Sequence, residues 1–164
     1  MIKSLSLTMG SRKTLVQIKE QNKDRDLLLF RCADDHSKYL LADISGQPTI
    51  FNAGLEYQVN KMSRFKAVQK EDYFELRYLT LDEDEQKVFN SMMEGWHSEH
   101  TQPLGLVESL VLRSKSKSYE YLLINIWQHE HDFLAWNSSK NNELINFGHG
   151  GNKKPLISEY VLAQ

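Results

Sequence analysis

The chain has 164 residues, with 20 Lys and Arg against 22 Asp and Glu, so its formal net charge is −2. Its length and its 40% hydrophobic and 26% charged residues are typical of a globular protein that folds without disulfides, and they argue against a disordered chain. The absence of a basic excess argues against a nucleic-acid partner, and no apolar run is long enough to predict a membrane span. A single cysteine, Cys32, and a lysine at position 3 instead of an apolar leader favour a cytoplasmic protein.

Residues 1–70 are rich in predicted strands. Alternating apolar residues predict strands over 2–8, 14–19, 27–32 and 39–44, and Ser45-Gly46-Gln47-Pro48 predicts a turn. Residues 55–62 predict a short helix, because Leu55, Val59 and Met62 recur on one side of a helical projection.

Residues 71–164 show a clearer order of elements. A strand over 73–81 is followed by Asp82 and Glu85, which have the spacing of a capping box. The helix that starts there carries one apolar stripe: Val88, Phe89, Met92, Met93 and Trp96. Strands over 106–113 and 119–127 flank a polar turn and predict a hairpin, and a helix over 130–137, a short helical piece over 143–147 and a strand over 155–163 complete the chain.

The order strand, helix, strand, strand, helix, strand is the ferredoxin-like arrangement. Its antiparallel sheet has helices on one face only, so the other face must be covered by a second copy or by residues 1–70. We therefore expect an α+β fold in which a ferredoxin-like half, residues 71–164, packs on the strand-rich half, residues 1–70. This predicts a dimeric-barrel-like structure within one chain, which is a monomer or a homodimer.

Several stretches of the second half resemble the antibiotic-biosynthesis-monooxygenase family. They include its two-part heme-degrading members and the non-catalytic signal transduction protein TRAP. The most specific stretches are Tyr121–Trp127 and Phe133-Leu134-Ala135-Trp136, which are similar to the family's strand ending in Trp and the Phe-x-x-Trp helix that follows. Arg77–Leu81, Pro103–Val107 and Val111–Arg113 add to the likeness, whereas the first half is similar in layout and in fragments such as Leu15–Ile18.

The resemblance implies heme chemistry at three positions. The heme-degrading members use an Asn on the first strand, a ring-distorting Trp and a His that ligates the iron about ten residues after that Trp. Trp136 matches the Trp, but Arg77 stands at the Asn position and Asn146 at the His position. His149 is the nearest histidine, and an insertion within 137–142 would bring it to the iron-ligand position.

The hypothesised pocket lies between the second-half sheet and its helices, near Arg77, Phe89, Met93, Trp136 and His149. We name Trp136, Arg77 and Asn146 as candidate catalytic residues. His149, Phe89, Met93 and Trp136 are the candidates for binding heme, with His149 as the metal ligand. The alternative for Arg77 is a partly exposed side chain paired with Glu75 or another acid.

Other motifs favour structural roles. His97-x-x-His100 and His129-Glu130-His131 lack a firm third ligand, and the second pair would alternate across a continuing strand. Gly148-His149-Gly150-Gly151 is typical of a connection rather than of a phosphate loop, and Cys32 is typical of a buried, inert thiol.

Three functions remain open. The first is a heme-degrading monooxygenase-like enzyme that binds heme or a heme-like ligand. The second is a non-catalytic binding or stress-signalling protein on the same fold, and the partner expected overall is a small hydrophobic or heme-like ligand. The third is a cofactor-free oxygenase acting on an aromatic substrate.

Overall fold

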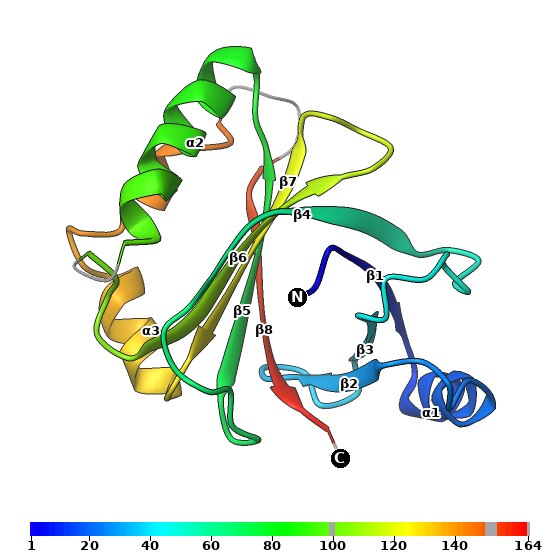
Figure 1. The fold of residues 1–164 in the computed structure, drawn as a ribbon. Coiled ribbons are helices and arrows are strands. Elements are labelled where there is room, and N and C mark those ends of the chain that lie inside the picture. Colours follow the sequence, from blue (N-terminus) through cyan, green and yellow to red (C-terminus); the bar gives the residue numbers. More distant parts are fainter. Residues whose placement is uncertain (99–100, 150–153, 164) are drawn as a thin grey trace.

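A computed structural model describes residues 1–98, 101–149 and 154–163. Its elements are β1 (Ser4–Gly10), α1 (Arg12–Gln21), β2 (Leu27–Cys32), β3 (Tyr39–Asp43), β4 (Leu55–Arg64), β5 (Tyr73–Thr80), α2 (Glu83–Trp96), β6 (Leu106–Ser114), β7 (Glu120–Trp127), α3 (Glu130–Asn137), the 3-10 helix η1 (Glu143–Asn146) and β8 (Leu156–Leu162). The strands form one closed antiparallel barrel in the order β1-β3-β2-β8-β5-β7-β6-β4 (Figure 1). In the described part of the chain, no helix is long and apolar enough to cross a membrane.

Each half of the chain contributes one continuous arc of the barrel. The arc from residues 71–164 is β8-β5-β7-β6, and the arc from residues 1–70 is β2-β3-β1-β4. The arcs join where β4 pairs with β6 and where β2 pairs with β8. Strands of the first half therefore cover the open face of the second-half sheet, and the expected α+β barrel is confirmed. The division into domains at residue 70 stays a prediction.

The helices lie outside the barrel. α2 and α3 cover the outer face of the second arc, and α1 lies against the first arc (Figure 1). Three apolar clusters result: one inside the barrel, one under α2 and α3, and a smaller one under α1. Six of the eight strands contribute side chains to two of these clusters, because successive side chains point to opposite faces. In β7, Leu122 and Ile126 point into the barrel, while Leu123 and Trp127 point toward the helices.

Most elements lie where the sequence predicts them, including the capping box of α2. The Asp82 side chain accepts from Glu85 N at 2.8 Å, and the Glu85 side chain closes the box in the other direction. Phe89 and Met93 of the predicted stripe are buried, but Val88 is 61% exposed, so the apolar face of α2 is narrower than predicted.

Two predicted elements were wrong. Residues 14–19 belong to helix α1, which Ser11 caps by accepting from Thr14 N, and Leu15 is its buried contact. The short apolar run over 14–19 fits both the period of a strand and the period of a helix. Packing of one helix face against the barrel stabilises the helix. Residues 55–62 belong to strand β4, because β1 and β6 hydrogen-bond to its two edges. That pairing outweighs the local helical spacing.

Candidate functional site

A row of polar side chains crosses the helix-facing side of the second arc. Glu75 of β5 lies opposite Asn125 of β7, and Asn125 lies opposite Ser109 of β6. Asn125 Nδ2 donates to Glu75 Oε1 at 3.2 Å, and Ser109 Oγ donates to Asn125 Oδ1 at 2.7 Å. All three residues are buried. Buried polar groups need hydrogen-bond partners, and these side chains supply partners for one another along the row.

Arg77 extends the row at the Glu75 end. Its Nε donates to Glu75 Oε2, and its Nη2 donates to Asn137 Oδ1 at 2.5 Å. The guanidinium carbon lies 5.3 Å from the ring centroid of Trp136, within the range of a cation–π contact. Trp127 Nε1 donates a further hydrogen bond to Glu75 Oε1 at 3.0 Å. Burial raises the pKa of the Glu75 carboxyl, although the charge of Arg77 acts to lower it. Arg77 thus pairs with Glu75, as the alternative interpretation of this residue predicted, but its side chain is buried and not partly exposed.

The row ends at Trp96 and His97, at the end of α2. Trp96 Nε1 donates to Ser109 Oγ at 3.1 Å, and His97 Nε2 lies 3.2 Å from the same oxygen. Burial lowers the pKa of His97 to about 4, so its ring is neutral at pH 7. Because Ser109 gives its proton to Asn125, the neutral ring donates from Nε2, and Nδ1 is left as a buried acceptor without a partner in the described structure.

Aromatic side chains fill the rest of the space under α2 and α3. The Trp136 ring centroid lies 5.2 Å from that of Trp96 and 5.4 Å from that of Trp127. Phe89 packs edge-on against Tyr121 and Phe147, with 5.5 Å between ring centroids in both pairs. Met93 belongs to the same buried cluster. The hypothesised pocket is therefore occupied by the protein's own side chains.

The structure brings Arg77 and Trp136 together, but it places the other two heme candidates apart from them. Asn146 and His149 are both exposed. His149 Nε2 lies 2.6 Å from the carbonyl oxygen of Ile145, a local contact on its own loop. The rest of the glycine-rich loop, residues 150–151, lies outside the described residues.

Heme does not fit these residues as they stand. A planar macrocycle needs an open volume bounded by an axial ligand and by the ring-distorting Trp. Here Trp96, Trp127 and Arg77 pack on Trp136. Trp136 and Trp96 also border a surface depression of about 500 Å³, but His149 does not line it, and the exposed His149 ring has its Nε2 in a hydrogen bond.

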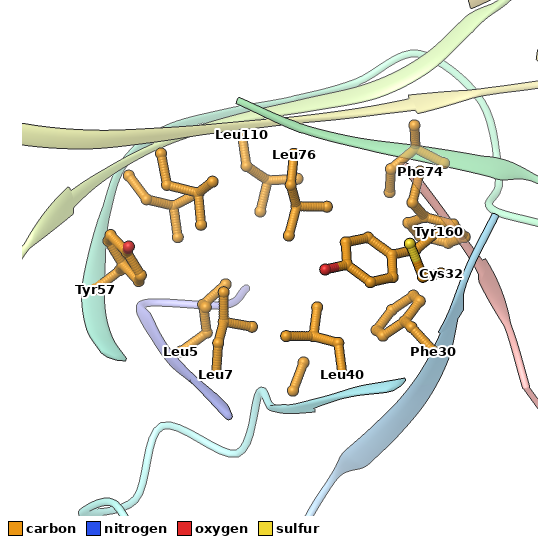
Figure 2. Packing of buried hydrophobic residues seen from close by; sticks show 14 of the residues in the cluster. Leu5, Leu7, Phe30, Cys32, Leu40, Tyr57, Phe74, Leu76, Leu110 and Tyr160 are labelled. Atoms are coloured by element: carbon orange, nitrogen blue, oxygen red, sulfur yellow. The ribbon is translucent and has the colours of Figure 1, made fainter. Parts of the chain in front are cut away.

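A cavity of about 270 Å³ lies instead inside the barrel. Figure 2 shows Leu76 and Leu110 of the second arc facing Leu5, Leu7 and Leu40 of the first arc across this interior. Its lining is apolar except for Glu108 and Arg64. Burial also raises the pKa of Tyr57, in the same cluster, to about 12, so the phenol stays uncharged at neutral pH.

The sequence analysis missed both the polar row and the barrel cavity. The signal for the row is a polar residue within each of three apolar strands: Glu75, Ser109 and Asn125. Since alternate residues of a strand share one face, such residues indicate buried polar groups on one face of the sheet. The cavity has no such signal, because its lining comes from all eight strands and the loop that contains Val68.

The remaining motifs are placed as follows. Cys32 is buried, its Sγ lies 2.8 Å from Asp34 Oδ1, and burial raises the pKa of the thiol, as expected of an inert cysteine. β7 ends at Trp127, so His129 and His131 do not alternate across a strand. Their rings stack at 4.8 Å, and with Asp132 they bring three ligand-type atoms within 4.8 Å of one another on the surface. His100 lies outside the described residues.

Comparisons with known proteins support the fold. No family model and no curated protein matches the chain. Among solved structures, a Listeria monocytogenes ferredoxin-fold protein related to antibiotic biosynthesis monooxygenases is similar, with a TM-score of 0.82 and 19% identity over 99% of this chain and 95% of that one. A major regulator of staphylococcal pathogenesis has a TM-score of 0.78 and 14% identity over 99% and 100%. A heme-degrading enzyme from Listeria monocytogenes has a TM-score of 0.77 and 19% identity over 98% and 100%.

These likenesses confirm the predicted resemblance at the level of the fold. The same architecture serves a heme-degrading enzyme and a regulator, so the fold does not choose between the open functions. The choice depends on the sites of this chain.

Proposed function

We propose that this protein is a non-catalytic binding protein on a monooxygenase-type fold, and that it holds a small apolar molecule inside its barrel. The observation that carries the proposal is the apolar cavity of about 270 Å³ between the two arcs. This corresponds to the second of the three functions that the sequence left open.

The size and lining of the cavity suit a small guest. An apolar cavity of about 150 Å³ stays dry and binds benzene in another protein, so a volume of 270 Å³ accommodates a larger molecule of up to about ten carbon atoms. Water is poorly stabilised in this cavity, because the leucine, isoleucine and phenylalanine side chains of the lining form no hydrogen bonds with it. A porphyrin is too large for the same space.

The helix-facing side of the sheet supports binding over catalysis. Both oxygenase functions are expected to hold their substrate beside Trp136. There Trp96, Trp127 and Arg77 pack on the Trp136 ring, and none of Arg77, Asn146 and His149 lines the surface depression of about 500 Å³ that Trp136 also borders. Opening this packing would move Trp136 off the Arg77 guanidinium and disturb the surroundings of the buried Arg77–Glu75 ion pair, which is costly. Heme degradation remains the alternative, because a heme-degrading enzyme shares the fold.

A ligand-dependent thermal shift tests the proposal. A guest that binds only the folded state raises the unfolding midpoint with concentration. We expect 1-octanol and heptyl methyl ether to raise the midpoint of the wild-type protein. Ala42→Leu, which adds three carbon atoms inside the cavity, should abolish the shift. Ala135→Leu adds the same atoms on the exposed surface of α3 and should preserve it.

Hemin tests the alternative on the same preparations. We expect no stoichiometric Soret band and no loss of absorbance after a reductant is added. A Soret band that His149→Ala removes, together with reductant-dependent bleaching, would establish heme degradation in place of our proposal.

A further inference from the structure

Glu108 is an unusual residue in the lining of the barrel. The register between β6 and β7 shifts between Leu106 and Glu108, so a bulge interrupts the strand there. Leu106 faces the helices, whereas Val107 and Glu108 both face the barrel, and alternation resumes with Ser109 toward the helices and Leu110 toward the barrel. The extra residue of a bulge is known to re-aim a side chain in this way. A carboxylate thus enters a cavity whose other lining residues, apart from Arg64, are apolar.

The Glu108 carboxylate is poorly compensated. Its side chain is 4% exposed, and in the described part of the chain its charged partner is Arg64, the opposite residue on β4, at 3.5 Å. The Arg64 side chain is 60% exposed, so water screens much of its charge from the Glu108 carboxylate. Burial raises the pKa of Glu108 although Arg64 acts in the opposite direction. The carboxylate keeps acceptor capacity for a guest that carries a hydrogen-bond donor.

Arg64 also lies between the cavity and the surface. A surface depression that includes Asp26, Ser45 and Met62 shares Ile2, Ile44 and Arg64 with the barrel cavity. These three residues therefore lie between the barrel cavity and the surface depression. A guest that enters there places its apolar body among the leucines of the barrel and its polar end beside Glu108.

We propose that the guest is an uncharged apolar molecule with one hydroxyl group, an alcohol or a phenol, whose O–H donates to Glu108. This inference rests on the proposed function, and it adds the chemical class of the ligand. An ammonium group would lose its hydration inside the barrel, and apart from Glu108 the lining offers no acceptor for its remaining N–H groups, so the ion pair would not repay that cost. A carboxylate group would meet the charge of Glu108. A hydroxyl group satisfies the buried acceptor without bringing in a second charge.

Four probes of similar length separate these cases: 1-octanol, heptyl methyl ether, octylamine and octanoate. Dissociation constants are measured at pH 7.5 by calorimetric titration, with thermal shifts in parallel. We expect 1-octanol to bind about tenfold more tightly than the ether, because the ether accepts but cannot donate. Octylamine and octanoate should both bind more weakly than 1-octanol.

Glu108→Leu tests the anchor directly. It removes the acceptor and should make 1-octanol and the ether bind with similar affinity, while Arg64 stays hydrated. Glu94→Gln is the matched control, because it breaks an ion pair with Lys61 on the outside of the protein and should keep the tenfold preference.

The outcomes distinguish the two proposals. Equal binding of 1-octanol and the ether to the wild-type protein would overturn the assignment of Glu108 and leave the apolar site intact. Tighter binding of octylamine or octanoate would also overturn the hydroxyl class. If none of the four probes binds, the barrel is not a binding site and both proposals fail.

Discussion

Glu75 and Arg77, two residues apart on β5, form a buried ion pair on the face of the sheet that α2 and α3 cover. The pair sits where the family resemblance places the catalytic pocket, and Trp136 packs over the guanidinium. In this protein, packed side chains therefore fill the position that the resemblance assigns to heme.

Removing one charge of this pair should destabilise the protein strongly. Glu75→Gln leaves Arg77 buried without a counter-charge, and we expect a loss of about 3–5 kcal/mol in the free energy of unfolding. Urea denaturation measures it. Glu94→Gln, which breaks an exposed pair, should cost at most about 1 kcal/mol. A similar cost for both variants would show that the buried pair is not specially important.

His97 should make the protein less stable in acid. Burial holds the pKa of the folded state at about 4, below the ordinary value of 6.5. The unfolded chain therefore binds the proton first, and stability falls as the pH drops from about 6.5 to about 4. His97→Gln should remove this part of the slope. Denaturation midpoints of both proteins between pH 4 and 7 measure the difference, and parallel curves would contradict the assignment.

His149 should contribute little to the folded protein. Its side chain is exposed, and its one hydrogen bond in the described structure is the local one between Nε2 and the carbonyl oxygen of Ile145. We expect His149→Ala to change the free energy of unfolding by less than about 0.5 kcal/mol and to leave 1-octanol binding unchanged. A loss of ligand binding would place His149 at the site.

Substitution by alanine should change the stability of the protein in opposite directions at two glycines. Gly105 has a φ of +87°, and an added Cβ would lie 2.4 Å from Asp132 Cγ, so Gly105→Ala should destabilise by more than about 1 kcal/mol. Gly95 lies inside α2, and an added Cβ there meets nothing within 4 Å. Gly95→Ala should stabilise by about 0.5–1 kcal/mol, because alanine is the better helix former. Thermal unfolding of both variants checks the pair.

The candidate site was only partly predictable. Arg77 and Trp136 stood out by their positions in the resembled motifs, and the structure places them in contact. That Arg77 would be buried on Glu75 could not be foreseen, because the closure of the helices over the sheet is a long-range packing event. The register shift at Leu106 and Glu108 was equally hidden, since a bulge is defined by the neighbouring strand.

The sequence by itself determined the local elements with strong periods: the strands of the second half, the capping box at Asp82 and the helix over 130–137. Alternation and capping act within a few residues, so they can be read along the chain. Only the tertiary structure decided that residues 14–19 are helical, that residues 55–62 join β1 and β6, and that Glu108 points into the barrel. In these cases the deciding hydrogen bonds and apolar contacts come from strands distant in sequence, and their free energy outweighs local preference.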